Sequence, residues 1–173
     1  GDQAVASVGT GTVGHEMCNV SLGTSGVVFV ESKHYSDIED NALHVFAHAD
    51  GKYHFMGVTL SAAASNEWWM NNILDTKDYS KEQENITNLG ENDVYFLPYL
   101  IGERTPHNNP DARGAFFGLT METTREQMTQ AVLEGVAYSL RDCLEIIKEK
   151  DINIDRIRIN GGGAKSQLWC EII

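Results

Sequence analysis

The chain has 173 residues, of which 42% are hydrophobic and 22% are charged, and its formal net charge is −12. This length and composition favour one globular unit with a hydrophobic core and argue against a disordered chain. The acidic excess argues against binding to the bare phosphate backbone of nucleic acid, which needs dense Lys and Arg. The sequence has no apolar run of about 20 residues and no signal peptide, so we expect no membrane segment.

The cysteines and the chain ends give two further expectations. Cys18, Cys143 and Cys170 lack the spacing of a zinc site and do not suggest a disulfide framework, so the cytoplasm is the expected location. The chain begins at Gly1 instead of Met and stops in an apparent helix, which favours a piece of a longer protein.

The first part of the chain predicts an antiparallel meander that follows a short helix over residues 3–8. Glycine-containing turns separate the β-rich segments, and the Asp50-Gly51 turn is the strongest hairpin signal among them. Four strands are therefore expected, over Met17–Leu22, Val27–Glu31, Leu43–His48 and Tyr53–Leu60.

The second part predicts alternating helices and strands. Helices are expected over Ser61–Leu74, Ser80–Leu89 and Thr124–Lys150 and from near Lys165 or Ser166, and strands over Val94–Leu100, Ala115–Leu119 and Arg156–Asn160. Thr123 and Glu126 have the spacing of a capping box at the start of the long helix. This order indicates a mixed α/β fold. It resembles the ribonuclease H-like domain of the actin-like ATPases, a mixed sheet with an antiparallel meander flanked by helices.

Two glycine motifs resemble nucleotide-binding patterns in residue type, but their context or spacing does not fit. Gly9–Gly14 fits the dinucleotide fingerprint, but a helix-like segment precedes it and a strand follows, which is the reverse of the required context. Gly163–Ser166 lacks the upstream spacing and the second glycine of a P-loop. We expect neither motif to act in that way.

Two other glycine segments have a plausible chemical use. The turn Gly23–Gly26 exposes consecutive backbone N–H groups that can bind a phosphate, although an ordinary hairpin turn explains the same letters. Gly161–Ala164 lies between a strand and a helix, where the lack of side chains lets a flat ring approach the backbone. A tight connection is the alternative there, and one glycine would serve it.

Several polar and aromatic residues have competing interpretations. Asp2 beside Gln3 is either a catalytic base that accepts a hydroxyl proton or a helix cap. His44 and His48 would lie about 13 Å apart on one strand, too far for one metal. Trp68 and Trp69 favour positions in the core and at its rim over a cofactor-binding role. Arg104 and His107 lie in an irregular loop, Gly102–Arg113, where a solvated or ion-paired role competes with a functional one.

Together and in this order, these motifs resemble the carbohydrate kinases of the FGGY family over the whole chain. Gly1-Asp2-Gln3 is similar to the family's catalytic turn, and Ser21–Gly26 to its phosphate-binding hairpin. Gly114–Leu119 with Gln127–Glu134 resembles the C-terminal signature, and Gly161–Ala164 the adenosine motif.

The resemblance implies a set of site residues. It makes Asp2 the catalytic base and Gln3 a second sugar-binding residue. Relatives have a Gly and a Gln where this chain has Ala63 and Glu67. The residues implied to bind ATP are Gly23, Thr24, Ser25, Ala63, Glu67, Gly162, Gly163, Ala164 and Gln167.

Within the family, the loop Gly102–His107 is most similar to that of xylulokinases, and gluconokinases carry a related loop. The resemblance therefore implies transfer of phosphate from ATP to D-xylulose with Mg²⁺, with gluconate or another sugar or polyol as the alternative substrate. It also implies that residues 1–173 are an incomplete C-terminal nucleotide-binding domain that lacks its N-terminal sugar-binding partner. A piece without kinase activity and a nucleotide sensor are the remaining interpretations, and the oligomeric state, a homodimer included, is left open.

Overall fold

The computed structural model describes residues 17–33, 42–48, 51–150 and 152–173, and the single residues 5, 9 and 35. Asp2 and Gln3 lie outside the described residues, as do most of the helix predicted over residues 3–8 and most of Gly9–Gly14. In the described ranges, no helix is both long and apolar enough to span a membrane.

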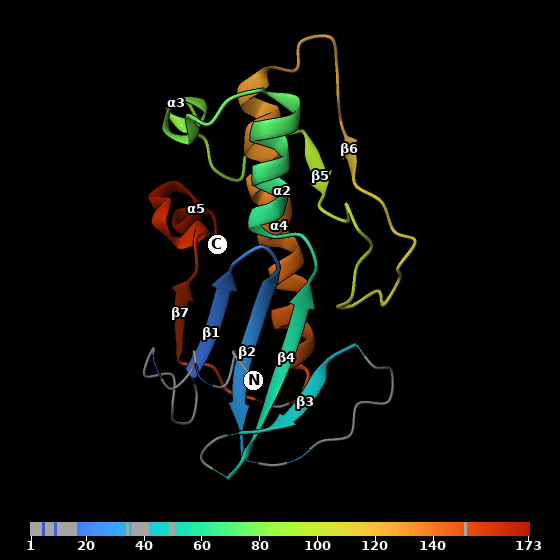
Figure 1. Ribbon diagram of the computed structural model, residues 1–173, viewed down its shortest axis with the longest axis vertical. Helices are drawn as coiled ribbons and strands as arrows, with labels where there is room; N and C mark the ends of the chain where they lie inside the picture. Colours follow the sequence, from blue (N-terminus) through green and yellow to red (C-terminus); the bar gives the residue numbers. More distant parts are fainter. Residues whose placement is uncertain are drawn as a thin grey trace.

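A five-stranded mixed sheet organises the fold (Figure 1). Its strands are β1 (Met17–Leu22), β2 (Gly26–Ser32), β3 (His44–Ala47), β4 (Tyr53–Thr59) and β7 (Arg156–Asn160), in the order β3-β4-β2-β1-β7. β1 pairs antiparallel with β2 and parallel with β7, and β4 pairs antiparallel with both β2 and β3. The predicted mixed sheet with an antiparallel meander is therefore confirmed.

The apolar run of β2 explains why the sheet is buried on both faces there. Val27, Val28, Phe29 and Val30 are all buried, and alternate residues of a strand point to opposite faces. Val28 and Val30 belong to the main core, whereas Val27 and Phe29 pack with Val58 on the opposite face. A run without polar alternation indicates a strand that is covered on both sides.

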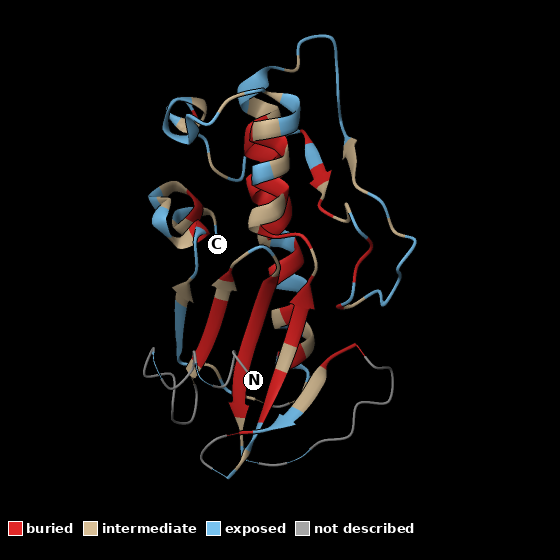
Figure 2. Ribbon diagram, viewed as in Figure 1, coloured by how far each residue is buried: buried red, intermediate tan, exposed pale blue. Residues whose placement is uncertain are grey.

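Helix α4 (Arg125–Lys148) covers one face of the sheet and continues past its edge, and its inner side forms a buried stripe (Figures 1 and 2). Leu133, Val136 and Leu140 are buried in this stripe, as the helical spacing predicts. A Cβ at Gly57 would lie 2.6 Å from the Cβ of Cys143, so glycine lets β4 approach the helix closely.

The start of α4 corrects one prediction by a single residue. The capping box joins Thr124 and Gln127, whose side chain accepts from the Thr124 N–H at 2.8 Å, instead of Thr123 and Glu126. The Thr123 hydroxyl accepts from the N–H of Thr120 at 2.8 Å and so stabilises the preceding turn. Both pairs satisfy the same sequence rule, because two threonines are followed three residues later by Glu or Gln.

The helix predicted over Ser61–Leu74 divides into two conformations. It begins as α2 (Ala63–Trp68) and continues directly as a π-helical turn, η1 (Trp69–Ile73). The Trp69 ring is buried and its Nε1 donates to the Thr129 hydroxyl of α4 at 3.0 Å, which confirms a core position for this residue. The wider turn thus coincides with the residue that anchors the segment to α4.

The strands predicted near residues 94–119 are shorter than expected and do not join the main sheet. β5 (Tyr95–Leu97) and β6 (Ala115–Phe117) pair with each other beside α4 (Figure 1). Pro98 follows β5 and cannot donate to a ladder, and Gly118 follows β6 with a φ of +82°. These two residues limit each strand to three positions.

Two short helices complete the fold on the other side of α4. α3 (Tyr79–Gln83) is shorter than the predicted Ser80–Leu89, because the chain turns after it to bury Ile86 in the core. α5 (Gln167–Ile172) follows a 3₁₀ turn, η2 (Gly163–Lys165), and its start near residue 166 is confirmed.

Two buried histidines lie on the sheet face opposite α4. His54 stacks on Phe29 with ring centroids 4.4 Å apart, and His48 packs edge-on against His54. In the described part of the chain, both ring nitrogens of His48 and the Nδ1 of His54 are buried without a hydrogen-bond partner. Burial, followed by the effect of His48, lowers the pKa of His54 from 6.5 to about 4.

This lowered pKa predicts loss of stability in mild acid. Between pH 6.5 and pH 4 the unfolded chain binds a proton at His54 that the folded chain does not, so the free energy of unfolding falls as the pH falls. Solvent screens part of the effect, and we expect a loss of about 2 kcal/mol by pH 4. Urea unfolding at several pH values measures it, and an equal loss in a His54→Leu variant would contradict this origin.

Candidate functional site

Three of the predicted site segments begin where strands of the main sheet end. β1 runs parallel to β7 and, through β2, in the same direction as β4, so the carboxyl ends of all three strands meet at one edge of the sheet (Figure 1). The turn Gly23–Ser25 follows β1, α2 follows β4, and Gly161–Gly163 follows β7. Ligands of α/β folds commonly bind at such an edge.

The turn after β1 is fixed by the start of α2. The Thr24 carbonyl accepts from the N–H of Ala62 at 2.9 Å, and the Gly23 carbonyl accepts from Ala63 at 2.8 Å. A trans peptide points its N–H away from its C=O, so the N–H groups of Thr24 and Ser25 point away from α2. These two N–H groups donate to no acceptor within the described residues, and they remain available to an anion.

The three consecutive glycines after β7 differ in what their backbone and neighbours require. Gly161 has a φ of +95°, and a Cβ there would lie 2.6 Å from the Leu22 carbonyl oxygen. A Cβ at Gly163 would lie 2.9 Å from the Trp169 ring. Gly162 has an ordinary φ of −63°, and a Cβ there would meet nothing within 4 Å. Backbone and packing therefore require two of the glycines, while the third leaves open space for a ligand.

A cavity of about 580 Å³ lies between α2, α3 and the segment that follows β7. Its described walls consist of Ala63, Asn66, Glu67, Tyr79, Ser80, Gln83, Glu84, Gly162, Gly163, Lys165, Ser166, Gln167, Leu168 and Trp169. This volume is within the range of small-molecule sites.

The cavity brings together five of the residues that the sequence predicts for ATP binding. These are Ala63, Glu67, Gly162, Gly163 and Gln167. The predicted residues Gly23, Thr24, Ser25 and Ala164 do not line the cavity. The turn Gly23–Ser25 borders it, because the N–H of Ala64 in the first turn of α2 donates to the Thr24 carbonyl. Asp2 and Gln3 lie outside the described residues.

The wall that α3 contributes was not predicted from the sequence. Gln83 of this helix accepts from the Ser166 hydroxyl at 3.2 Å, and Ser166 also caps α5 by accepting from the Trp169 N–H. The pair therefore ties α3 to α5 across the cavity. No local signal marks this wall, because α3 and α5 are about 80 residues apart in the chain. Asn66 was also missed, although it lies three residues after Ala63 and hence on the same side of α2.

The charges in the cavity favour a ligand that is held mainly by neutral groups. Glu67 and Glu84 outnumber the single cation, Lys165, among the described lining residues. Burial, followed by the effect of Glu67, raises the pKa of Tyr79, so this phenol stays neutral at physiological pH. No group of three His, Cys, Asp or Glu side chains in the described ranges could hold a metal ion.

The loop after residue 101 fixes the β4–α2 junction. The Glu103 carboxylate is buried and accepts from the Thr59 hydroxyl at 2.5 Å and from the Leu60 N–H at 3.0 Å. Thr105 exchanges two further hydrogen bonds with Val58 of β4. Because the Gly23–Ser25 turn is bonded to the residues directly after this junction, Glu103 positions the turn indirectly.

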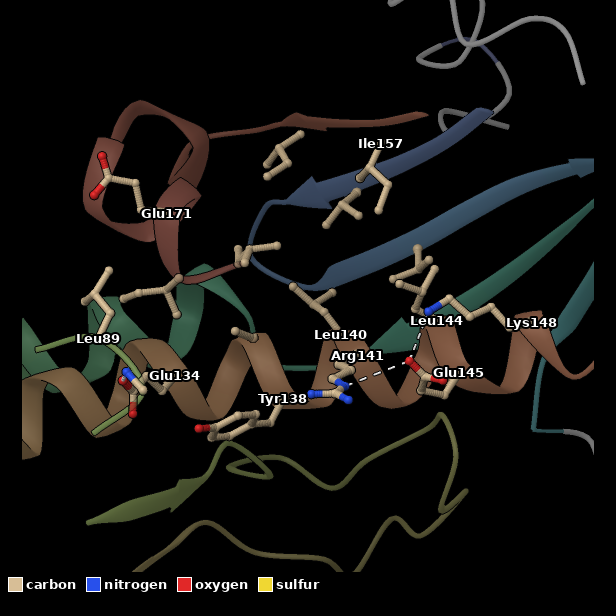
Figure 3. A pocket seen from close by; sticks show the side chains of 17 residues that line it. Leu89, Glu134, Tyr138, Leu140, Arg141, Leu144, Glu145, Lys148, Ile157 and Glu171 are labelled. Atoms are coloured by element: carbon tan, nitrogen blue, oxygen red, sulfur yellow. Dashed lines mark hydrogen bonds and ion pairs between the residues drawn. The ribbon is translucent and has the colours of Figure 1, made fainter. Parts of the chain in front are cut away.

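A larger cavity of about 660 Å³ lies between α4, α5 and the sheet (Figure 3). Its walls include Leu140, Leu144 and Ile157, and both cations on its rim, Arg141 and Lys148, are paired with Glu145. None of the described residues predicted to bind nucleotide lines it. A mainly apolar cavity whose two cations share one carboxylate, and whose wall also carries Glu134 and Glu171, does not suit a triphosphate.

Comparison with solved structures identifies the fold. A xylulose kinase from Brucella ovis superposes with a TM-score of 0.91 at 42% identity, over 99% of this chain and 36% of that one. A xylulose kinase from Bifidobacterium adolescentis gives 0.84 at 36% identity, over 96% and 33% of the two chains. The fold is that of the sugar kinases among the actin-like ATPases, as the element order predicts.

Sequence comparison identifies the family. Residues 18–173 match the C-terminal domain of the FGGY family of carbohydrate kinases. The xylulose kinase of Escherichia coli strain K12 is 39% identical over 176 residues, which cover 100% of this chain and 36% of that protein. The chain therefore belongs to the FGGY family of carbohydrate kinases. It spans about a third of the length of these relatives, 36% for the Escherichia coli enzyme.

Proposed function

We propose that this chain forms the nucleotide-binding part of an ATP-dependent sugar kinase that phosphorylates D-xylulose to D-xylulose 5-phosphate. The observation that carries the proposal is the cavity at the carboxyl ends of β1, β4 and β7, beside a turn with two N–H groups that have no acceptor among the described residues. Family membership supports a phosphotransferase that uses ATP. The names of the similar proteins support the sugar, since they are xylulose kinases at 37–39% identity.

The proposed mechanism assigns a separate task to each segment. The N–H groups of Thr24 and Ser25 hold the phosphates of ATP, and the nucleoside lies in the cavity against Gly162. The Asp2 carboxylate takes the proton of the sugar hydroxyl while the hydroxyl oxygen bonds to the γ-phosphorus. The bond from that phosphorus to the bridging oxygen of ADP breaks, and ADP leaves. Gln3 helps to hold the sugar.

Magnesium remains a prediction from the resemblance, because phosphoryl transfer from ATP commonly uses it to neutralise charge. The described residues offer no three-ligand group for it. Glu67 and Glu84 are the carboxylates that line the described cavity.

A substrate panel tests the proposed reaction. The full-length enzyme that contains this chain is incubated with ATP and D-xylulose, gluconate, glycerol or no sugar, and ADP release is measured. We expect the highest kcat/KM with D-xylulose. A higher kcat/KM with gluconate would make gluconate the substrate instead of D-xylulose. The absence of sugar-dependent ADP release would contradict the kinase proposal.

Gly162 gives a second test, directed at the nucleotide site. Because a Cβ at this position meets open space, Gly162→Ala and Gly162→Val should fold normally while their side chains occupy the volume proposed for the nucleoside. We expect KM for ATP to rise about tenfold in the valine variant and less in the alanine variant, with unfolding midpoints unchanged. Unchanged KM values in both variants would place the nucleoside elsewhere.

A further inference from the structure

Asn66 carries a buried acceptor for which the described protein supplies no partner. The residue is 5% exposed and lines the cavity beside α2, and its Oδ1 has no hydrogen bond in the part of the chain that the structure describes. A buried acceptor without a partner costs about 1–3 kcal/mol. Asn is also a weak helix former compared with Ala or Leu. Neither folding nor helix propensity accounts for this residue at this position.

The neighbours of Asn66 do not supply the missing donor. Ser65, the preceding residue, donates its hydroxyl to the Ser61 carbonyl at 2.7 Å. On the facing wall, the Ser166 hydroxyl donates to Gln83. The Asn66 oxygen is therefore a buried acceptor in the cavity wall for which a ligand can supply the donor.

The position of Asn66 along α2 selects the part of the nucleotide that it faces. The N–H of Ala63 holds the Gly23 carbonyl of the proposed phosphate turn, and Asn66 lies three residues farther, a rise of about 4.5 Å. The base is the part of ATP farthest from the phosphates, so a group within one helical turn of the phosphate end is near the ribose.

We propose that Asn66 Oδ1 accepts a hydrogen bond from a ribose hydroxyl of the bound nucleotide, and that it makes the site selective for ribonucleotides over deoxynucleotides. This inference rests on the proposed nucleotide site and adds a residue to it. Asn66 is a binding residue and takes no part in the transfer of the proton or the phosphate.

The experiment compares nucleotides in the full-length enzyme. KM and kcat are measured with D-xylulose and with ATP, 2′-deoxy-ATP, 3′-deoxy-ATP or inosine triphosphate, for the wild type and Asn66→Leu. We expect the wild type to prefer ATP about tenfold over at least one deoxynucleotide, as one hydrogen bond would give. In Asn66→Leu, KM for ATP should rise about tenfold, KM for that deoxynucleotide should stay the same, and the preference should disappear.

A matched control separates this role from a general effect on folding. Ser65→Ala also removes a buried polar group from α2, but Ser65 does not line the cavity, so it should leave the ratio of ATP to deoxynucleotide unchanged. Asn66→Leu should unfold at the same temperature as the wild type or higher, because it removes an acceptor without a partner.

The outcomes distinguish this inference from the proposed function. Normal kinase activity with the same ribose preference in Asn66→Leu would overturn the inference and leave the proposed function intact. A changed preference between ATP and inosine triphosphate, with the ribose preference retained, would place Asn66 at the base and overturn the ribose assignment. Absence of sugar-dependent ATP turnover in the wild type would overturn the proposed function itself, and this inference with it.

Discussion

The full-length enzyme with Asp2→Asn should lose about 10³-fold in kcat for sugar phosphorylation while it still binds ATP. The amide has nearly the shape of the carboxylate but cannot accept the proton of the attacking hydroxyl, and general base catalysis commonly contributes 10²- to 10⁴-fold. Nucleotide binding should persist because the groups proposed to bind ATP, the N–H groups of the turn after β1 and the cavity wall at Gly162, belong to other residues. Steady-state kinetics and ATP titration by calorimetry measure the two effects.

A matched control is available for this substitution. Asp93 is an exposed carboxylate in the segment before β5, away from the cavity, and Asp93→Asn should keep wild-type kcat and KM. A kcat for Asp2→Asn within a few-fold of the wild type would show that another group accepts the proton. Asp2 would then be left with the role of a helix cap.

The second large effect concerns stability. Glu103→Ala should lower the free energy of unfolding by about 3–5 kcal/mol, because it removes a buried side chain and leaves three donors without their acceptor. These donors are the Thr59 hydroxyl and the N–H groups of Leu60 and Arg104. Denaturant unfolding of the wild type and the variant measures the difference.

Glu103→Gln separates the lost hydrogen bonds from the lost volume. The amide keeps one acceptor oxygen for the Leu60 and Arg104 N–H groups, so we expect it to cost about 1 kcal/mol. Because Leu60 leads directly into α2, KM for ATP should rise in both variants, and more in the alanine variant. An alanine variant with wild-type unfolding would contradict this account of the loop.

Local sequence rules predicted the elements whose structure depends on residues that are close in the sequence. The two hairpins follow from β-rich segments with turn residues between them, and the buried stripe of α4 follows from helical spacing. The glycines after β7 were predicted to form a ligand-contacting turn. The structure shows that Gly161 and Gly163 satisfy backbone and packing requirements, and that Gly162 is the one that leaves room.

Features that depend on tertiary contacts could not be predicted. The pairing of β5 with β6 outside the main sheet depends on packing against α4, and the π-helical turn coincides with the bond from Trp69 to Thr129, a residue 60 positions away. The cap at Thr124 was placed one residue early because Thr123 satisfies the same rule. Asn66 was missed because its lack of a partner becomes visible only when the neighbouring side chains are placed.

The central claim is that ATP binds between α2 and Gly162, with its phosphates at the turn after β1. A crystal structure of the full-length enzyme with a non-hydrolysable ATP analogue tests it most directly. We expect the phosphates within hydrogen-bond distance of the Thr24 and Ser25 N–H groups, and the nucleoside in the 580 Å³ cavity. An analogue bound in the apolar cavity of Figure 3, or away from both β1 and β7, would contradict the account.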